Sequence, residues 1–384
     1  MSAFRASLVL LLLAASARAE HRALLGASVY GGMTGFKDDQ LVQLSGAGFK
    51  LVSFVPTYPY IDLNRIDFAG GPSWKNLEDA TTLALYSGFT VVLKPHLDPA
   101  SYITGYTPPE EVAHSWRMDC GWRGYFDVDP MTKDYREGLV LKSLETLKRA
   151  LERQKGPVPP IRLELGAELM NSTVYFPQSW AALVDYAKKE RQRLGLDGKV
   201  LLSHNFEHHI EMPSDELSRM TPEGRKFLAQ YIKGLDELAL SQYMDLTVAV
   251  PEEERGSRLP TAGEVAKAFA IHEKNFREKV LEGLLGLKPS EIPPIQIGEF
   301  GVGTGGLKAP NLWAGELDAE KEKALDEQIA LGHAGLVKYL ESGKGPGTAS
   351  LWTIGKHYDV FGWGNPAYAI PAAADADRAY LKAP

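Results

Sequence analysis

The sequence predicts an α/β fold, a (β/α)8 TIM barrel built as a single domain, from two observations. Short apolar runs that are typical of strands alternate with longer helical patterns, and the pair recurs about eight times along the chain. No obvious linker separates these units into two domains. Eight βα units in one chain of 384 residues favour a closed barrel over an open sheet.

The expected strands follow one another in a regular order. The first two runs are aliphatic and aromatic, the third passes from Val-Val-Leu into Lys-Pro-His, and the fourth and seventh each end in a glutamate. The eight runs are 24–30, 50–56, 90–96, 161–168, 200–205, 238–244, 294–299 and 349–354. Helical spacing of apolar residues fills the intervals at 38–48, 74–87, 132–154, 178–194, 222–234, 262–285 and 318–341.

The first 19 residues have the pattern of a secretory signal peptide. Arg5 supplies a positive charge, residues 7–15 are apolar but too few to span a bilayer, and Ala17-Arg18-Ala19 is a small-residue cleavage motif. We expect cleavage after Ala19, a barrel domain at 20–384, and a protein secreted to the extracellular space or the periplasm. A buried first helix is the alternative.

Charge and cysteine content limit the partners of the protein. The formal net charge is −7, and such a surface repels nucleic-acid phosphates, so we expect no nucleic-acid partner. No stretch after the signal segment is apolar enough to suggest a membrane partner. Cys120 is the single cysteine, which excludes a disulfide within the chain. The sequence does not indicate the oligomeric state.

Two carboxylates at strand ends are the main candidates for chemistry. Glu299 follows Ile295 and Ile297 on one face of its strand if side chains simply alternate, and Glu168 ends another strand in the same way. The carboxyl ends of parallel barrel strands meet at one rim, so these residues are expected to face each other across a pocket. Glu164 then points into the barrel below Glu168.

A carboxylate inside a barrel needs a buried partner, and the sequence offers one for Glu164. Lys94 lies two residues before His96, so both share a face of the third strand and point the same way as Glu164. We therefore interpret Glu164 as a structural charge paired with Lys94, and Glu168 as a reacting group. A salt bridge at the rim is the alternative for Glu168.

This arrangement resembles the retaining glycoside hydrolases of clan A, which are built on (β/α)8 barrels. The resemblance covers most of the chain after residue 24. It implies that Glu168, in Gly166-Ala167-Glu168, is the acid/base, and that Glu299, in Gly298-Glu299-Phe300, is the nucleophile. It also implies that Tyr243 contacts the nucleophile and that Trp352 forms the floor of the sugar pocket; an ordinary core tyrosine is the alternative for Tyr243.

One residue departs from the clan pattern. Most members have Asn directly before the acid/base, where it contacts the sugar 2-hydroxyl, and this chain has Ala167. Together with the run Lys94-Pro95-His96, this small residue is similar to family 113, the β-mannanases. The resemblance then implies an endo-β-1,4-mannanase, with His96 or Asn171 as substitutes for the missing contact. A barrel that binds carbohydrate without cleaving it, and a hydrolase of β-glucan or another β-glycan, are the alternatives.

Aromatic residues near the expected rim suit a sugar cleft, because flat rings pack on the apolar faces of pyranoses. We expect Trp116 and Trp363 to join Trp352 in binding a polysaccharide or oligosaccharide, although some of these rings could fill the core. Asn205 or His204 is expected to point inward from the fifth strand.

Two further patterns were considered as cofactor or metal sites. Residues 301–306 contain GxGxxG, but the Pro-containing segment that follows lacks the helix that a dinucleotide site requires. His204, His208 and His209 are clustered without a fixed set of further ligands, so a surface cluster is favoured over a metal site. We therefore expect no cofactor and no bound metal.

Overall fold

The computed structural model describes residues 22–62, 65–99, 103, 107, 124, 126–207, 217, 220–243, 246–302, 319–354, 360–363, 366 and 369–383. The expected signal peptide, Trp116, Cys120, His208 and His209 lie outside these residues. Within them, no helix is long and apolar enough to cross a membrane.

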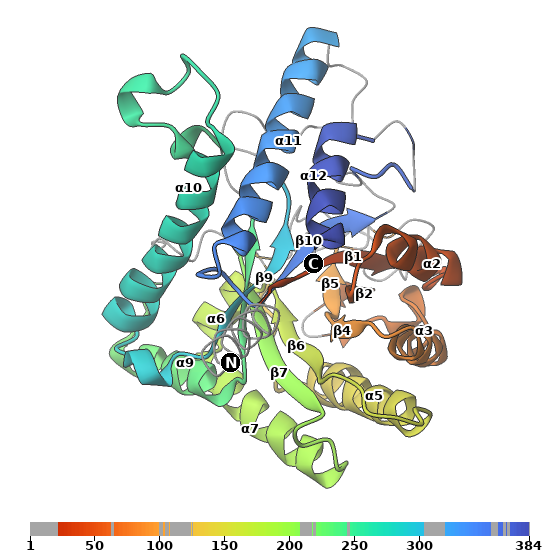
Figure 1. Ribbon diagram of the computed structural model, residues 1–384. Helices are drawn as coiled ribbons and strands as arrows, with labels where there is room; N and C mark the ends of the chain where they lie inside the picture. The colour runs from red at the N-terminus through yellow and green to blue at the C-terminus, as the bar shows by residue number, and fades with distance from the viewer. Residues whose placement is uncertain are drawn as a thin grey trace, which may run out of the picture.

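Eight parallel strands close into a barrel, as predicted (Figure 1). Each strand pairs with the next in the chain, and β1 closes the ring by pairing with both β2 and β10. The barrel strands are β1 (Leu24–Gly31), β2 (Leu51–Asp62), β4 (Thr90–Leu93), β6 (Ile161–Ala167), β7 (Val200–Phe206), β8 (Leu238–Gln242), β9 (Ile295–Phe300) and β10 (Thr348–Ile354). Two short strands extend β2 at the rim: β3 (Arg65–Ile66) and β5 (His96–Asp98).

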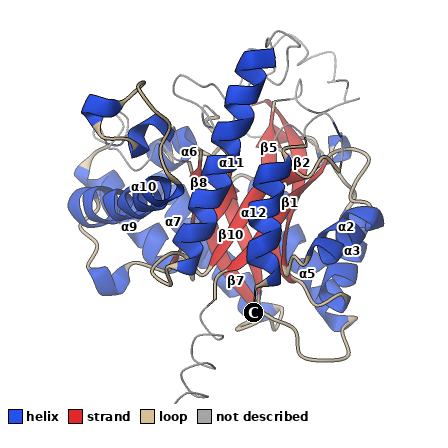
Figure 2. Cartoon of the chain, turned by 45° about the horizontal axis from the view of Figure 1, so that its top comes forward, coloured by secondary structure: helices blue, strands red, loops and turns tan. Residues whose placement is uncertain are grey.

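Helices surround the barrel (Figure 2). All seven predicted helical stretches are present, and the described part of the chain also contains two helices that were not predicted, α6 (Met170–Tyr175) and α12 (Pro371–Lys382). The others are α2 (Asp38–Ala47), α3 (Trp74–Tyr86), α5 (Lys142–Glu152), α7 (Pro177–Arg193), α9 (Pro222–Gly234), α10 (Ala262–Asn275) and α11 (Ala319–Glu341). Two π-helical segments adjoin them, Asp134–Leu141 before α5 and Phe276–Leu284 after α10. Short 3-10 turns in the described residues include Phe68–Gly70, Leu246–Ala249, Glu252–Glu254 and Pro289–Glu291.

Helix ends are set by local sequence. The hydroxyls of Ser73 and Thr221 accept hydrogen bonds from backbone N–H groups in the first turns of α3 and α9. Thr261 and Glu264 form a capping box at the start of α10. Gly48 ends α2 with φ of 96°, a left-handed conformation in which glycine avoids a Cβ penalty.

The third barrel strand is shorter than predicted. The expected run 90–96 divides into β4 and β5, with Lys94 and Pro95 between them. Pro95 has no backbone N–H to donate to a neighbouring strand, which favours the break at this point. Lys94 still donates its backbone N–H to Phe54 O at 2.9 Å, so the chain stays beside β2 and carries the Lys94 side chain into the barrel.

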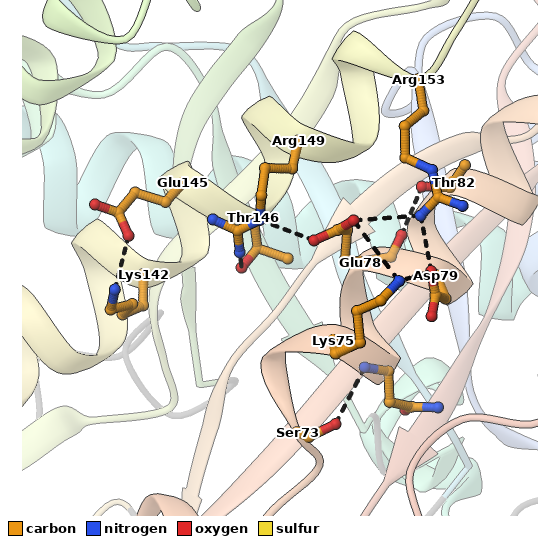
Figure 3. A network of polar contacts seen from close by, with 11 residues as sticks. Ser73, Lys75, Glu78, Asp79, Thr82, Lys142, Glu145, Thr146, Arg149 and Arg153 are labelled. Carbon is orange, nitrogen blue, oxygen red and sulfur yellow. Dashed lines mark hydrogen bonds and ion pairs between the residues drawn. The ribbon is translucent and has the colours of Figure 1, made fainter.

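Charged side chains join α3 to α5 on the outside of the barrel (Figure 3). Glu78 accepts from Arg149 at 2.8 Å and Arg153 at 3.2 Å, and Asp79 accepts from Arg153 at 2.7 Å and Lys75 at 2.5 Å. The neighbouring guanidinium and ammonium groups hold the pKa values of both carboxyls below their usual range. Such an exposed network contributes modestly to stability.

The C-terminal helix α12 closes the outer layer next to β1. The Tyr380 hydroxyl donates to Ala23 O at 2.6 Å, just before β1 begins. Buried His333 Nδ1, on α11, lies 2.8 Å from Asp377 Oδ2. These contacts tie the end of the chain to the amino-terminal end of the barrel, opposite the rim where Glu168 and Glu299 lie.

Candidate active site

Glu299 is where four side chains meet inside the barrel mouth. It is 1% exposed. Its Oε1 lies 3.2 Å from Lys94 Nζ and 3.3 Å from His96 Nε2. The same oxygen accepts from Asn205 Nδ2 at 3.3 Å, and Oε2 accepts from the Tyr243 hydroxyl at 2.8 Å. Three hydrogen-bond donors and the nearby His96 ring therefore hold one carboxyl group in a fixed orientation.

A register shift, and not simple alternation, points Glu299 inward. β9 advances by two residues from Ile297 while β8 advances by one, so an extra residue lies just before Glu299. Ile295 and Ile297 belong to the apolar core outside the barrel, which corrects the expectation that they share the inner face with Glu299. Gly298 occupies the shift, and a Cβ there would lie 2.3 Å from Asn205 Oδ1.

Glu168 is placed by a second irregularity of the same kind. Between Glu164 and Ala167, β6 advances by three residues while β7 advances by two. A Cβ on Gly166 would meet Trp180 and His204 on the outside of the barrel, so simple alternation from Glu164 to Glu168 is wrong. An isolated glycine within a strand pattern is a signal for a bulge, and Gly166 and Gly298 each precede a candidate carboxylate.

The backbone of Glu168 is strained. Its φ is 54°, and among the described residues it is the non-glycine residue with a positive φ. Its N–H donates to Asn205 O at 2.8 Å, and its side chain is 6% exposed. A left-handed residue with a Cβ costs on the order of 1–3 kcal/mol and such residues gather at functional sites. The strain therefore marks Glu168 as a functional candidate on grounds independent of any motif.

Lys94 and Glu164 form a layer of ionisable side chains directly below Glu299. Lys94 is 0% exposed and Glu164 is 3% exposed. Lys94 Nζ lies 3.6 Å from Glu164 Oε2, so the predicted pair is present. However, Lys94 donates to Gly298 O at 2.7 Å and lies nearer to Glu299 than to Glu164. The sequence indicated the pair but not that Lys94 also contacts Glu299.

Burial dominates the protonation of Glu164. The pKa of its carboxyl is raised to about 8, mainly by loss of solvation; Lys94 opposes the rise and the charge of Glu299 adds to it. Glu164 is therefore mostly protonated at neutral pH, and Glu299 is the other carboxyl group that Lys94 contacts.

The remaining predicted residues divide into those near Glu299 and those away from it. The ring of His96 stacks on Trp352 with centroids 5.3 Å apart and an interplanar angle of 21°. Asn205 is fully buried and also donates to Ser241 Oγ at 2.9 Å, an interaction that sequence reasoning missed. Asn171 lies on α6, three residues after Glu168.

Trp363 is not at the rim. Its ring stacks on Phe361 at 4.5 Å and approaches Phe49 at 6.4 Å. Phe49 precedes β2, at the amino-terminal end of the barrel. Trp363 thus packs against the outer core, and its expected contact with substrate is withdrawn. Trp116, the other expected tryptophan, lies outside the described residues.

His204 points away from the barrel interior, whereas Asn205 points into it. The His204 ring packs among Trp180, Phe206 and Tyr231, and its Nδ1 lies 2.8 Å from the Tyr231 hydroxyl. Burial lowers the pKa of His204 to about 3. It is a core histidine, neither a surface cluster member nor a rim residue. In the part of the chain that is described, no group of three or more His, Cys, Asp or Glu side chains could hold a metal ion.

Comparison with known proteins gives similarity in structure but not in sequence. No protein-family model matches the chain, and no curated protein matches it. Among solved structures, a GH113 β-1,4-mannanase is similar with a TM-score of 0.56 and 15% identity, covering 94% of this chain and 100% of that chain. The GH113 β-mannanase AaManA from Alicyclobacillus acidocaldarius has a TM-score of 0.53 and 13% identity, with 94% and 97% covered.

A third similar structure is the exo-β-1,4-mannosidase Op5Man5 from Opitutaceae bacterium strain TAV5. Its TM-score is 0.54 at 13% identity, covering 94% of this chain and 59% of that chain. The structural neighbours are thus GH113 mannanases and other clan A glycoside hydrolases, as the resemblance implied. At this identity the likeness establishes the (β/α)8 barrel fold.

Proposed function

We propose that the protein is a retaining glycoside hydrolase that cleaves β-1,4-linked polysaccharide, with β-mannan as its substrate. The observation that carries the proposal is the fourfold contact on Glu299, at the end of the seventh barrel strand. The strained backbone of Glu168, which follows the fourth strand, supports a second reacting carboxyl at the same rim.

In this mechanism Glu299 attacks the anomeric carbon while Glu168 gives its proton to the leaving glycosidic oxygen. The bond from carbon to that oxygen breaks, and an ester to Glu299 forms. Glu168, now ionised, takes a proton from water, whose oxygen attacks the anomeric carbon and breaks the ester. Glu299 leaves as a carboxylate and Glu168 is protonated again, so both groups return to their starting protonation states.

The contacts around Glu299 agree with its role as the nucleophile. Three contacts fall on Oε1, whereas Tyr243 contacts Oε2, which leaves Oε2 as the oxygen suited to attack. Trp352 is partly exposed and stacks on His96, so its ring can support the apolar face of a pyranose.

Two observations favour mannan as the substrate. The three similar structures described above, each with a TM-score above 0.5, are named as β-mannanases or a β-mannosidase. Ala167 lies in register with Asn205 on the neighbouring strand β7. Most members of the clan have Asn at the position of Ala167, directly before the acid/base. A small side chain there leaves the sugar 2-position less enclosed, and the 2-hydroxyl is axial in mannose.

The test is hydrolysis of mannan, β-glucan, xylan and chitosan by the purified protein, with sizing of products and the anomeric form of the first product. We expect mannan to be cleaved to oligosaccharides that first appear as the β-anomer. Glu299→Gln should remove turnover, and azide should restore it in Glu299→Ala with inverted anomeric configuration. Azide with Glu168→Ala should give the retained configuration, which separates the two roles.

One observation favours a second candidate, a barrel that binds carbohydrate without hydrolysing it. Ala167 removes a contact that most clan members make to substrate. Affinity for an oligosaccharide without release of reducing ends during long incubation would support this candidate and refute the first.

We also propose that the protein is exported. The support is the pattern of residues 1–19. Amino-terminal sequencing of protein recovered from medium or periplasm should begin at Glu20. Intact Met1 on a protein retained in the cell would contradict export.

A further inference from the structure

Lys94 is placed unlike a residue that merely balances an interior charge. Its side chain is wholly buried, yet its shortest contacts are not to Glu164, the carboxylate in the layer beneath. The ammonium donates to Gly298 O at 2.7 Å and to Glu299 Oε1 at 3.2 Å, two adjacent residues of β9. It therefore crosses the barrel from the third strand and holds the bulge that aims Glu299.

Among the described residues, four charged or titratable groups besides Glu299 bear on Lys94. Glu164 comes from β6, His96 from β5 and Tyr243 from the end of β8, while Arg162 acts on Glu164 from below. Burial keeps Glu164 protonated at neutral pH, since its pKa is raised to about 8. The ammonium of Lys94 is then left to pair with Glu299.

We propose that Lys94 is a positioning residue for the reaction, which fixes Glu299 through its contacts with Oε1 and with the Gly298 carbonyl, and that Glu164 is its buried neighbour in the layer below. The proposal rests on the proposed function, because it assigns Lys94 a role in the attack by Glu299. In this role Lys94 provides the positive charge beside the nucleophile and does more than join two strands.

The competing explanation is that Lys94 contributes only to stability. A second ion pair inside the barrel provides a matched control. Arg162 also lies inside the barrel, and its guanidinium pairs with Glu237 towards the amino-terminal end. Arg162→Met therefore breaks a comparable interior ion pair without touching Glu299. A role confined to stability predicts similar consequences for Arg162→Met and Lys94→Met.

The experiment compares kcat/KM against pH for wild type, Lys94→Met, Glu164→Gln and Arg162→Met on the best substrate of the glycan panel. For Lys94→Met we expect a loss on the order of 100-fold. The acidic limb of the pH profile should move to higher pH, because the cation 3.2 Å from Oε1 of the nucleophile is gone. Glu164→Gln and Arg162→Met should leave that limb in place. An unmoved limb in Lys94→Met overturns the proposal.

A second measurement needs no turnover and keeps the test independent of the substrate. Urea unfolding midpoints are compared for Lys94→Met made in wild type and in Glu299→Gln. We expect a clearly smaller drop in the Glu299→Gln background, because the partner charge is already absent. Equal drops in both backgrounds overturn the pairing, whereas an inactive wild type with unequal drops refutes the proposed function and not the pairing.

Should Lys94→Met fail to fold, the double variant Lys94→Met/Glu164→Gln carries the same test. It also replaces the lower carboxyl by an amide, so the side chain at position 164 cannot ionise at any pH once the cation is gone. Its acidic limb is expected to be displaced as in Lys94→Met, and its unfolding midpoint is compared with and without Glu299→Gln. A limb in the wild-type position refutes the role of Lys94.

Discussion

Replacing Tyr243 by Phe removes one hydroxyl from the candidate site and leaves the ring in place. The hydroxyl donates to Glu299 Oε2 at 2.8 Å, whereas Lys94, His96 and Asn205 contact Oε1. A hydrogen bond to a charged group contributes about 1.5–3 kcal/mol. If the whole of this is lost in the attack of Oε2, kcat/KM falls roughly 10- to 150-fold.

The assay is kcat/KM on mannan or the best substrate found, measured across pH. Tyr380→Phe is the matched control, since it deletes a hydroxyl that donates to Ala23 O at 2.6 Å at the far end of the barrel. It should reduce stability by about 1 kcal/mol and leave kcat/KM unchanged. Equal activity in wild type and Tyr243→Phe, or equal losses in both variants, would refute the assignment of Tyr243.

Three further changes test the backbone and the core. Gly298→Ala should lower stability by about 1–3 kcal/mol and remove most of the activity, because the new Cβ displaces Asn205. The control Gly46→Ala on α2 places a Cβ with nothing within 4 Å, and it should leave stability in urea unfolding unchanged or raise it. Glu168→Gly should abolish turnover and keep or raise the unfolding midpoint, because it relieves a left-handed backbone; a large drop would argue against strain. The pKa of His204 is about 3 in the folded protein and 6.5 in the unfolded chain, so the contribution of neutral His204 to folding stability is complete above pH 6.5 and is lost as the pH falls towards 3. His204→Gln should therefore make the loss of stability between pH 6.5 and 3 less steep. Unfolding measured at successive pH values checks this.

Local pattern was enough to predict the barrel. Each strand is an apolar run between helices of recognisable spacing, and the alternation of the two types leaves few other topologies. The predicted stretch 222–234 matches α9, and the first strand differs from β1 by one residue. Counting strands also predicted that Glu168 ends the fourth strand and Glu299 the seventh; in the structure Glu168 directly follows the fourth.

Side-chain direction could not be predicted at the two positions that matter most. Period-two alternation assumes an unbroken ladder, and β6 and β9 each contain an extra residue beneath a candidate carboxylate. Alternation therefore gave Ile297 the wrong face. Gly166 and Gly298 were the available signals for these bulges.

Contacts across the barrel also lay beyond the sequence. Whether Lys94 meets Glu164 or Glu299 depends on the stagger between strands, which no single segment encodes. Trp363 is separated from Phe49 by most of the chain, so its packing at the opposite end could not be inferred from its place after the eighth strand.

The most direct test of the central claim is to trap the covalent intermediate. A 2-deoxy-2-fluoro glycosyl fluoride of the preferred sugar, which forms the ester quickly and releases it slowly, is incubated with the enzyme, followed by proteolysis and mass mapping. The account predicts inactivation and a single sugar ester on Glu299. Inactivation with the ester on Glu168, Glu164 or another residue, or turnover with no ester on Glu299, would contradict it.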